Sequence, residues 1–93
     1  MTTQETGVDG AFRQQVVEAM TVVLARLLQR TEPITENMGV MDELGLSSTL
    51  GLELMLGIED QLGILINLER MGPAEMATVG DMATYVATHS EPA

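Results

Sequence analysis

Three consecutive hydroxyl side chains, Ser47, Ser48 and Thr49, are the residues of this 93-residue chain that are best placed to do chemistry. They directly precede an apolar run with helical spacing, so each of them could cap a helix by accepting a hydrogen bond from a backbone N–H group. A serine acts as a catalytic nucleophile only when a neighbouring base activates it. The chain has no Lys and no Cys, and its one His, His89, lies near the chain end. These residues therefore predict no catalytic site, and helix capping is the default interpretation of the hydroxyls.

The composition excludes several other kinds of site and partner. Without Cys and with one His, the chain has no disulfide framework, no thiol nucleophile and no metal site of the cysteine or multi-histidine type, and no stretch has the ligand spacing of an EF-hand. A formal charge of −10 repels nucleic acid and anionic membrane surfaces and favours basic protein partners. No apolar run reaches the roughly 18 residues of a membrane span. We therefore expect a soluble, cytoplasmic monomer.

The first element that must position the hydroxyls is a long helix. Apolar residues recur at every third or fourth position from Phe12 to Leu28, which predicts a helix over about residues 9–30, ended by Pro33. Residues 31–46 have no such period and predict a long loop. Five apolar residues are available to pin this loop to the core: Ile34, Met38, Val40, Met41 and Leu44.

The hydroxyl residues begin a second predicted helix over about residues 50–62, which ends at Gly63, a residue type favoured after a helix C-terminus. Its core-facing row is predicted to be Leu50, Leu54, Met55, Ile58 and Leu62. By contrast, Leu56 points about 160° away from the middle of that row, which predicts exposure to partners.

Two shorter helices complete the predicted fold. Residues 68–76 allow only a turn or two because Gly72-Pro73 interrupts them, and the Thr78-x-x-Asp81 capping pattern begins a closing helix. No strand pattern is evident, so the fold class is all-α, a small four-helix bundle over residues 9–87 with flexible tails over residues 1–8 and 88–93. Eight Met residues predict adaptable core filling, or a bundle interior that opens for varied cargo.

The residues around the hydroxyls resemble the acyl carrier protein family, over about residues 12–87. In that family the attachment serine follows a Leu-Gly-x-Asp segment and begins a helix that reads Ser-Leu-x-x-x-Glu-Leu. The helix ends in acidic residues and an aromatic residue or Leu followed by Gly-Ile. This chain has Leu44-Gly45, Glu53-Leu54 and Leu62-Gly63-Ile64 in the same register without a gap. The register selects Ser48 as the attachment serine, with Ser47 as the alternative.

The resemblance implies a carrier that performs no catalysis itself. A phosphopantetheinyl transferase would attach the 4′-phosphopantetheine of coenzyme A to Ser48. An acyltransferase or an adenylating enzyme would load the thiol of this group, and a ketosynthase or another pathway enzyme would take the cargo. A helix start suits the phosphodiester, because its N–H groups are unpaired and the positive end of the helix dipole lies there.

The family's partner surface corresponds to five residues on the outward side of the second helix: Leu52, Glu53, Leu56, Glu59 and Asp60. The carboxylates would steer basic enzyme surfaces and the leucines would supply contact area. The chain departs from the usual family pattern at Ser47 (usually Asp), Thr49 (usually Leu or Met) and Leu50 (usually acidic). These departures favour a discrete polyketide or hybrid polyketide–peptide pathway, such as antibiotic biosynthesis. The alternatives are a peptidyl carrier and an unmodified helical adaptor.

Overall fold

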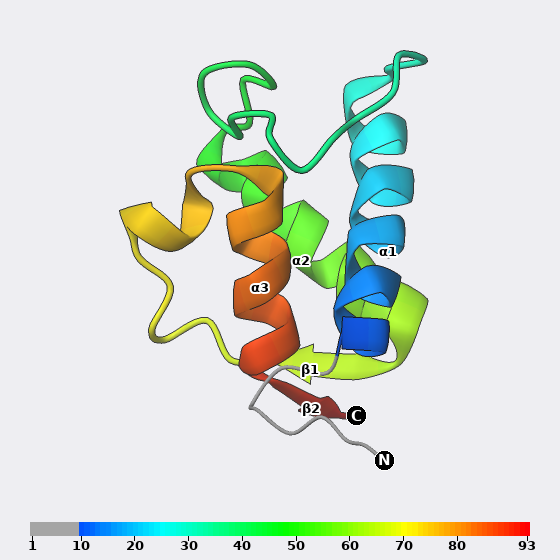
Figure 1. Cartoon of the computed structure of the whole chain (residues 1–93), viewed down its shortest axis with the longest axis vertical. Coiled ribbons are helices and arrows are strands. Elements are labelled where there is room, and N and C mark those ends of the chain that lie inside the picture. Colours follow the sequence, from blue (N-terminus) through cyan, green and yellow to red (C-terminus); the bar gives the residue numbers. More distant parts are fainter. Residues whose placement is uncertain (1–9) are drawn as a thin grey trace.

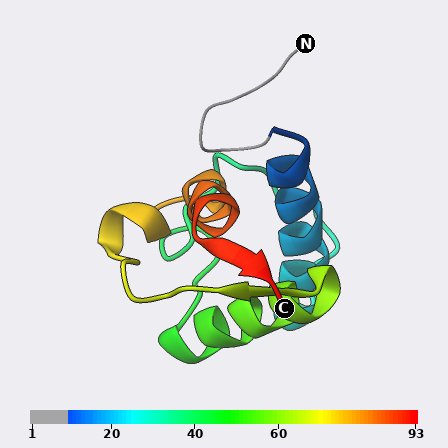
Figure 2. The same cartoon turned by 90° about the horizontal axis from the view of Figure 1, so that it is seen from below.

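The computed structural model describes residues 10–93, so the predicted tail over residues 1–8 lies outside the described part. The described chain contains three α-helices, one 3₁₀ helix and a two-stranded sheet (Figure 1). In chain order these are α1 (Gly10–Leu28), α2 (Ser48–Leu62), β1 (Ile64–Ile66), η1 (Pro73–Met76), α3 (Val79–Thr88) and β2 (Ser90–Pro92). Helix α1 packs against both α2 and α3, and η1 packs against α3 (Figure 2). None of the helices in residues 10–93 is long and apolar enough to cross a membrane.

The core lies between the three α-helices and contains most of the residues that their apolar spacing predicts. Five predicted residues are only half-buried and pack against it: Phe12, Leu27, Leu28, Leu50 and Leu62. The fully buried members with the largest side chains are Val16, Met20, Val23 and Leu24 of α1, Leu54 and Ile58 of α2, and Val79, Met82 and Val86 of α3. The loop before α2 adds Val40, Leu44 and Leu46, all of which are buried. Met41 was also expected to pin this loop, but its side chain is 60% exposed, so that prediction is wrong.

Helix α1 ends two residues earlier than predicted. Gln29 has a φ of 51°, in the left-handed region, and the N–H of Arg30 donates to the carbonyl of Ala25 at 2.9 Å. This wider hydrogen bond closes the helix end in the manner of a C-terminal cap. The left-handed conformation of Gln29 therefore ends α1, and Pro33 is too far along the chain to be the cause.

The prediction of an all-α four-helix bundle is wrong in two respects. The predicted third helix is only the single turn of η1, because Gly72 is extended (φ −120°, ψ −173°) and Pro73 starts the turn. In addition, β1 pairs antiparallel with β2, so residues 90–92, which were expected in a flexible tail, form a strand. Strand β1 alternates buried, exposed, buried, which places Ile64 and Ile66 on the core. The buried pair explains why this segment joins the core as a strand.

The long loop is fastened to the start of α3 by a short backbone ladder. The N–H groups of Val79 and Gly80 donate to the carbonyls of Met38 and Glu36, and the N–H of Val40 donates to the carbonyl of Ala77, each at 3.0 Å. The loop is therefore anchored by backbone hydrogen bonds as well as by its apolar side chains.

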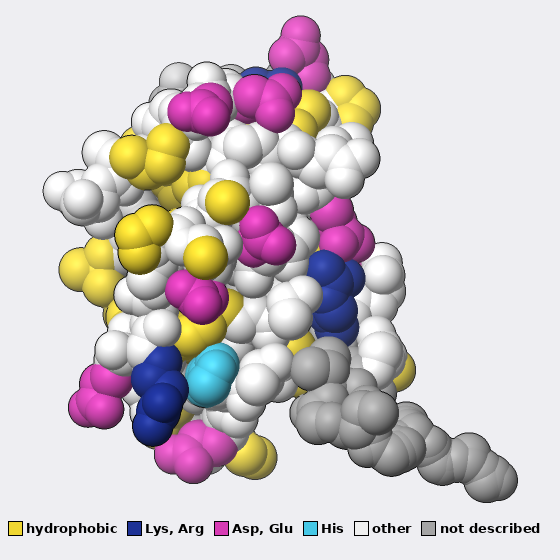
Figure 3. All heavy atoms as spheres, turned by 60° about the vertical axis from the view of Figure 1, so that its left-hand side comes forward, with side chains coloured by type: hydrophobic (Ala, Val, Ile, Leu, Met, Phe, Trp, Pro, Cys, Tyr) yellow, Lys and Arg dark blue, Asp and Glu magenta, His cyan; other side chains and the backbone are white. Residues whose placement is uncertain are grey.

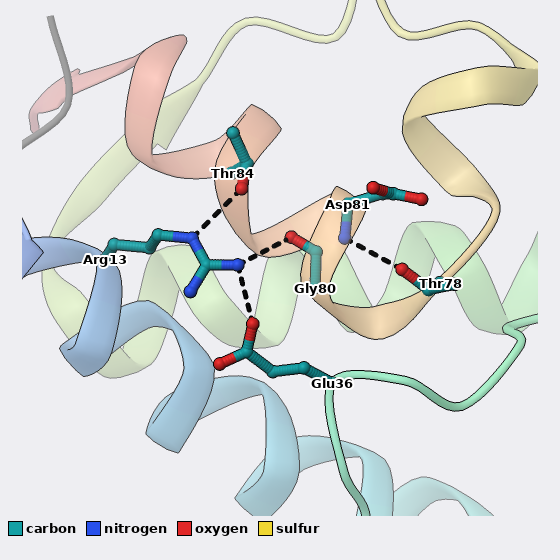
Figure 4. Close-up of polar contacts among 6 residues, drawn as sticks. All are labelled: Arg13, Glu36, Thr78, Gly80, Asp81 and Thr84. Carbon is teal, nitrogen blue, oxygen red and sulfur yellow. Dashed lines mark hydrogen bonds and ion pairs between the residues drawn. The ribbon is translucent and has the colours of Figure 1, made fainter.

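One guanidinium group joins the loop to two helices (Figure 4). Arg13 of α1 donates from Nη2 to Glu36 Oε1 at 2.6 Å and to the carbonyl of Gly80 at 3.1 Å, and from Nε to Thr84 Oγ1 at 3.0 Å. The hydrogen bond from Arg13 lowers the pKa of the Glu36 carboxyl, and the same bond raises the pKa of Arg13. A Cβ on Gly80 would lie 2.9 Å from Glu36 Oε1 and 3.3 Å from the Glu36 carbonyl oxygen, so a larger residue here would force Glu36 to shift.

Candidate functional site

Helix α2 begins at the hydroxyl residues, and the structure separates the roles of the two adjacent serines. Ser47 is the residue before the helix, and its Oγ accepts a hydrogen bond from the N–H of Leu50 at 3.1 Å. Ser48 is the first helical residue and is exposed. Its hydroxyl has no hydrogen-bond partner within the part of the chain that the structure describes. One hydroxyl therefore caps the helix, and the next is available for chemistry.

The surroundings of Ser48 suit an anionic ester better than a catalytic nucleophile. Helix α2 has no acidic residue in its first turn, so the positive end of its dipole is not neutralised from within the helix. His89 is the chain's one His, and it stacks on Tyr85 with the ring centroids 4.4 Å apart, at the far end of α3 from η1. The described residues therefore give Ser48 a favourable electrostatic setting without a histidine base.

A groove with a volume of about 440 Å³ lies beside Ser48. Its lining combines the loop before α2 with the segment that contains η1, and most of the side chains are apolar: Val40, Met41, Leu46, Met71, Pro73, Met76 and Ala77. Within residues 10–93, Asp42 is the one charged residue that lines it, while Ser47 and Ser48 form its border at α2. The side of the molecule that carries η1 shows hydrophobic side chains gathered among acidic ones (Figure 3).

Backbone hydrogen bonds fix the walls of this groove. The N–H of Leu46 donates to the carbonyl of Val40 at 3.0 Å, and the N–H of Val40 donates to the carbonyl of Ala77 at the same distance. Glu43 Oε1 accepts a hydrogen bond from the N–H of Gly39 at 2.8 Å, which closes the turn between them. The loop wall, the η1 wall and the start of α2 are thus connected through main-chain contacts.

The outward side of α2 carries most of the predicted partner residues. Leu52 and Leu56 are 54% and 55% exposed, and Glu53 and Asp60 are exposed beside them. The prediction that Leu56 lies outside the core is confirmed. Glu59 differs from the other four, because it is half-buried and its Oε2 accepts a hydrogen bond from the N–H of Ile66 at 2.8 Å. This carboxylate holds β1 against α2.

Sequence reasoning missed the groove and the Arg13 cluster. Met71 and Met76 flank Gly72-Pro73 without a helical period, so nothing local indicates that they face Met41 across a groove. The contact between Arg13 and Glu36 joins residues 23 positions apart and has no local signal. The interpretation of Met as core filling is confirmed for Met20, Met55 and Met82, which are buried.

Comparison with known proteins identifies the family to which this site belongs. A family model described as "Phosphopantetheine attachment site" matches residues 18–86, which include the start of α2 and most of the core. Neither the search of curated proteins nor that of solved structures found a match. Domains of this family carry a covalently attached 4′-phosphopantetheine group, are not catalytic themselves, are modified by a phosphopantetheinyl transferase and interact with pathway enzymes. The chain therefore belongs to the phosphopantetheine attachment family of carrier domains.

Proposed function

We propose that the chain is an acyl carrier protein whose phosphopantetheine group is attached to Ser48. The observation that carries this assignment is the division between the two serines: Ser47 caps α2 through Leu50, whereas the Ser48 hydroxyl is exposed and unengaged within the described residues. An ester at Ser47 would crowd the oxygen that accepts this hydrogen bond, while an ester at Ser48 would displace no contact. The first turn of α2 then faces the phosphate with its unpaired N–H groups.

The terminus of α2 suits the charge of this prosthetic group, since its first turn holds no acidic residue, and the exposed Ser48 hydroxyl gives access. When bound, the group supplies a terminal thiol on which acyl or aminoacyl intermediates are held as thioesters. The protein's own part is to present the hydroxyl and to stabilise the negative charge with the helix terminus, while the transferase would supply the base that activates the hydroxyl.

The outward side of α2 is proposed as the docking surface for the enzymes that load and unload the carrier. Leu52 and Leu56 are spaced four residues apart and are both more than half exposed, so they offer a continuous apolar strip. Glu53 and Asp60 lie along the same helix and favour basic enzyme surfaces. Glu59 belongs to this surface only in part, since one of its oxygens is engaged by β1.

The pathway that we propose is a discrete polyketide or hybrid polyketide–peptide pathway. Ser47, which is uncharged, caps α2 at the position where the family usually has Asp. Leu50 replaces a residue that is usually acidic, so the start of α2 is less acidic than in fatty-acid carriers. A transferase, an acyltransferase or adenylating enzyme, and a ketosynthase are the corresponding partners. A peptidyl carrier is the nearest alternative because it shares the attachment chemistry.

Loading with coenzyme A and a broad-specificity phosphopantetheinyl transferase tests the assignment. Intact mass should show one added phosphopantetheine on the wild-type chain and none on Ser48→Ala. The matched control, Ser47→Ala, should still be loaded, although loss of its cap should cost about 0.5–2 kcal/mol of stability. Loading of Ser48→Ala with loss in Ser47→Ala would move the site by one residue. Failure of the folded wild-type chain to be loaded would favour the unmodified adaptor.

A further inference from the structure

We propose that Arg26 of α1 is part of the surface on which this carrier binds its phosphopantetheinyl transferase, and that the transferase of the producing organism carries a carboxylate that pairs with it. The inference rests on the proposed attachment to Ser48 and on α2 as the docking surface. It adds a residue of a second helix to that surface. It also requires one acidic residue at a defined position on an otherwise basic partner.

The guanidinium group of Arg26 is available to a partner. Arg26 is exposed in the last turn of α1, and its side chain has no ion pair or hydrogen bond within residues 10–93. By contrast, Arg13 and Arg30 are paired with Glu36 and Glu32. A cation in the last turn complements the negative end of the helix dipole, but that effect requires no contact with another helix.

Helix packing brings Arg26 to the edge of α2. A Cβ on Gly57 would lie 3.6 Å from Arg26 Nη2, so the guanidinium lies next to the part of α2 that has no side chain of its own. The sequence of α2 contains no basic residue, and Arg70 is the one basic residue of the chain after Thr31. Arg26 therefore brings to α2 a positive charge that this helix lacks in its own sequence.

Charged and apolar residues follow in a fixed order around α2 from this contact. At about 100° per residue, Glu53 and Asp60 lie about 40° and 60° from Gly57 around the helix. Leu56 and Leu52 follow on the same side, at about 100° and 140° from Gly57, and both are more than half exposed. The surface thus presents three neighbouring rows: a guanidinium group, two carboxylates and two leucines.

Charge complementarity defines what an enzyme docked on this surface must carry. The carboxylates favour basic residues and the leucines favour apolar ones. A uniformly basic enzyme surface would also place a positive charge against Arg26, and like charges are strongly disfavoured across an interface. A carboxylate at that position removes the repulsion and pairs with a guanidinium that has no other partner. The pattern therefore selects an enzyme that matches it over one that does not.

The transferase is the partner to which we commit. It must contact Ser48 Oγ itself, whereas enzymes that act on the cargo reach it at the end of the prosthetic arm. Gly57 follows Ser48 by nine residues, which is about 14 Å along the helix. An interface of ordinary size, about 800 Å² on each partner, covers both positions.

Loading kinetics of the full chain with coenzyme A and the phosphopantetheinyl transferase of the producing organism test this inference. Arg26→Glu makes the chain more acidic, so electrostatic steering alone would speed loading by a basic enzyme. A carboxylate on the enzyme opposite Arg26 predicts the opposite sign. We expect Arg26→Glu to lower kcat/KM about 10-fold or more, and Arg26→Gln to lower it about 2- to 5-fold. The change should lie in KM, because Arg26 does not touch the reacting atoms.

Arg70→Glu is the matched control. It makes the same charge change at an exposed arginine outside α2, whose side chain also has no ion pair or hydrogen bond in the described part of the chain. Its kcat/KM should be unchanged or raised. Circular dichroism and denaturation midpoints establish that each variant is folded in the assay, and Arg26→Gln gives the same sign of effect if Arg26→Glu does not fold.

Charge reversal on the enzyme supplies the second measurement. Each acidic residue on the carrier-binding surface of the transferase is replaced by Lys in turn. One of these substitutions should restore the loading of Arg26→Glu and slow the loading of the wild-type chain.

The outcomes separate the two proposals. A folded wild-type chain that neither this transferase nor a broad-specificity one can load refutes the attachment and with it this inference. Loading by the broad-specificity enzyme alone overturns the choice of partner and leaves the carrier function standing. Loading of the Arg26 variants that is as fast as that of the wild type, or faster, refutes the inference alone. Slowing that is equal in Arg70→Glu, or that no Lys substitution reverses, also overturns the pairing.

Discussion

Arg13 and Glu36 show how one pair of side chains can fasten a long loop. The carboxylate accepts from Arg13 at 2.6 Å, and the main chain of Glu36 accepts from Gly80 at 3.0 Å. Residue 36 is thus held by α1 through its side chain and by α3 through its backbone. The loop that it anchors also supplies Val40 and Met41 to the groove beside Ser48.

This contact predicts a loss of stability on the acid side. The hydrogen bond from Arg13 lowers the pKa of Glu36 below its ordinary value of 4.5, so folding favours the ionised form. The stabilisation is present above that ordinary value and is lost as the pH falls through the lowered one. Because the Glu36 side chain is 41% exposed, solvent screening limits the effect to about 0.2–1 kcal/mol.

Chemical denaturation from pH 7 down to the acid range measures the contribution of the Arg13–Glu36 contact to stability. Glu36→Gln should be less stable than the wild type at pH 7, and the difference should shrink on acidification. Glu32→Gln is the matched control, because its pair with Arg30 is longer, at 3.4 Å, and its carboxylate is 76% exposed. A constant difference between wild type and Glu36→Gln at every pH would rule out the ion pair as its source.

At this scale the sequence predicts only what is encoded locally. Ser48 follows from the register of its neighbours, and the Thr78 cap from its spacing to Asp81, whose N–H donates to Thr78 Oγ1 at 3.1 Å. Ser47 and Ser48 are equally good capping residues by type, and the backbone conformation decides that Ser47 is the cap. The partner of Arg13 depends on how the helices pack, so no local pattern reveals it.

Helix α2 divides its leucines between the core and solvent within one turn. Leu54 is fully buried, whereas Leu56 is 55% exposed. Leu54→Ala should therefore cost about 2–5 kcal/mol of stability, and Leu56→Ala well under about 1 kcal/mol. Leu56→Ala should instead weaken partner binding by roughly 10- to 100-fold. Denaturation and a titration with a partner enzyme on the same variants separate the effects, and a large fall in the denaturation midpoint of Leu56→Ala would refute the docking role.

Two glycines of α2 make opposite predictions for the same substitution. A Cβ on Gly57 would lie 2.7 Å from Val23 Cγ1, where α1 and α2 pack, so Gly57→Ala should destabilise by about 1–3 kcal/mol despite its better helix propensity. A Cβ on Gly51 would meet only Leu46 Cδ2, at 3.9 Å, so Gly51→Ala should stabilise by up to about 1 kcal/mol. Equal effects of the two substitutions, measured by thermal denaturation, would contradict this account of the packing.

Elements with a long period or a capping residue were predictable, and short ones were not. The end of α2 at Gly63 is confirmed: the residue has a φ of 66° and its N–H donates to the carbonyl of Glu59 at 2.8 Å. The strands are three residues each, and Ser90-Glu91-Pro92 has little intrinsic preference for a strand. Their pairing depends on the three helices bringing both segments together.

The whole molecule carries a net charge of −10, and 11 of its 14 acidic residues follow residue 31. Loading by a transferase with a basic surface should therefore slow as salt rises, since screening acts over about 8–10 Å near physiological ionic strength. Glu53→Arg and Asp60→Arg should reproduce this slowing at low salt. Glu69→Arg is the matched control, because it changes the net charge by the same amount at an exposed position outside α2. Equal slowing by all three would indicate a net-charge effect without a docking surface on α2.

The pairing of β2 with β1 also sets the direction in which the chain leaves the domain. Pro92 lies opposite Ile64, and the N–H of Ala93 donates to the carbonyl of Gly63 at 3.1 Å, so the last residue is fixed at the C-terminal end of α2. Ser48 lies at the other end of this helix (Figure 1). A linker fused after Ala93, to a solid support or to a second module, would therefore leave the domain at the C-terminal end of α2, away from Ser48. In a domain immobilised in this way, Ser48 and the N-terminal end of α2 would stay accessible to partner enzymes.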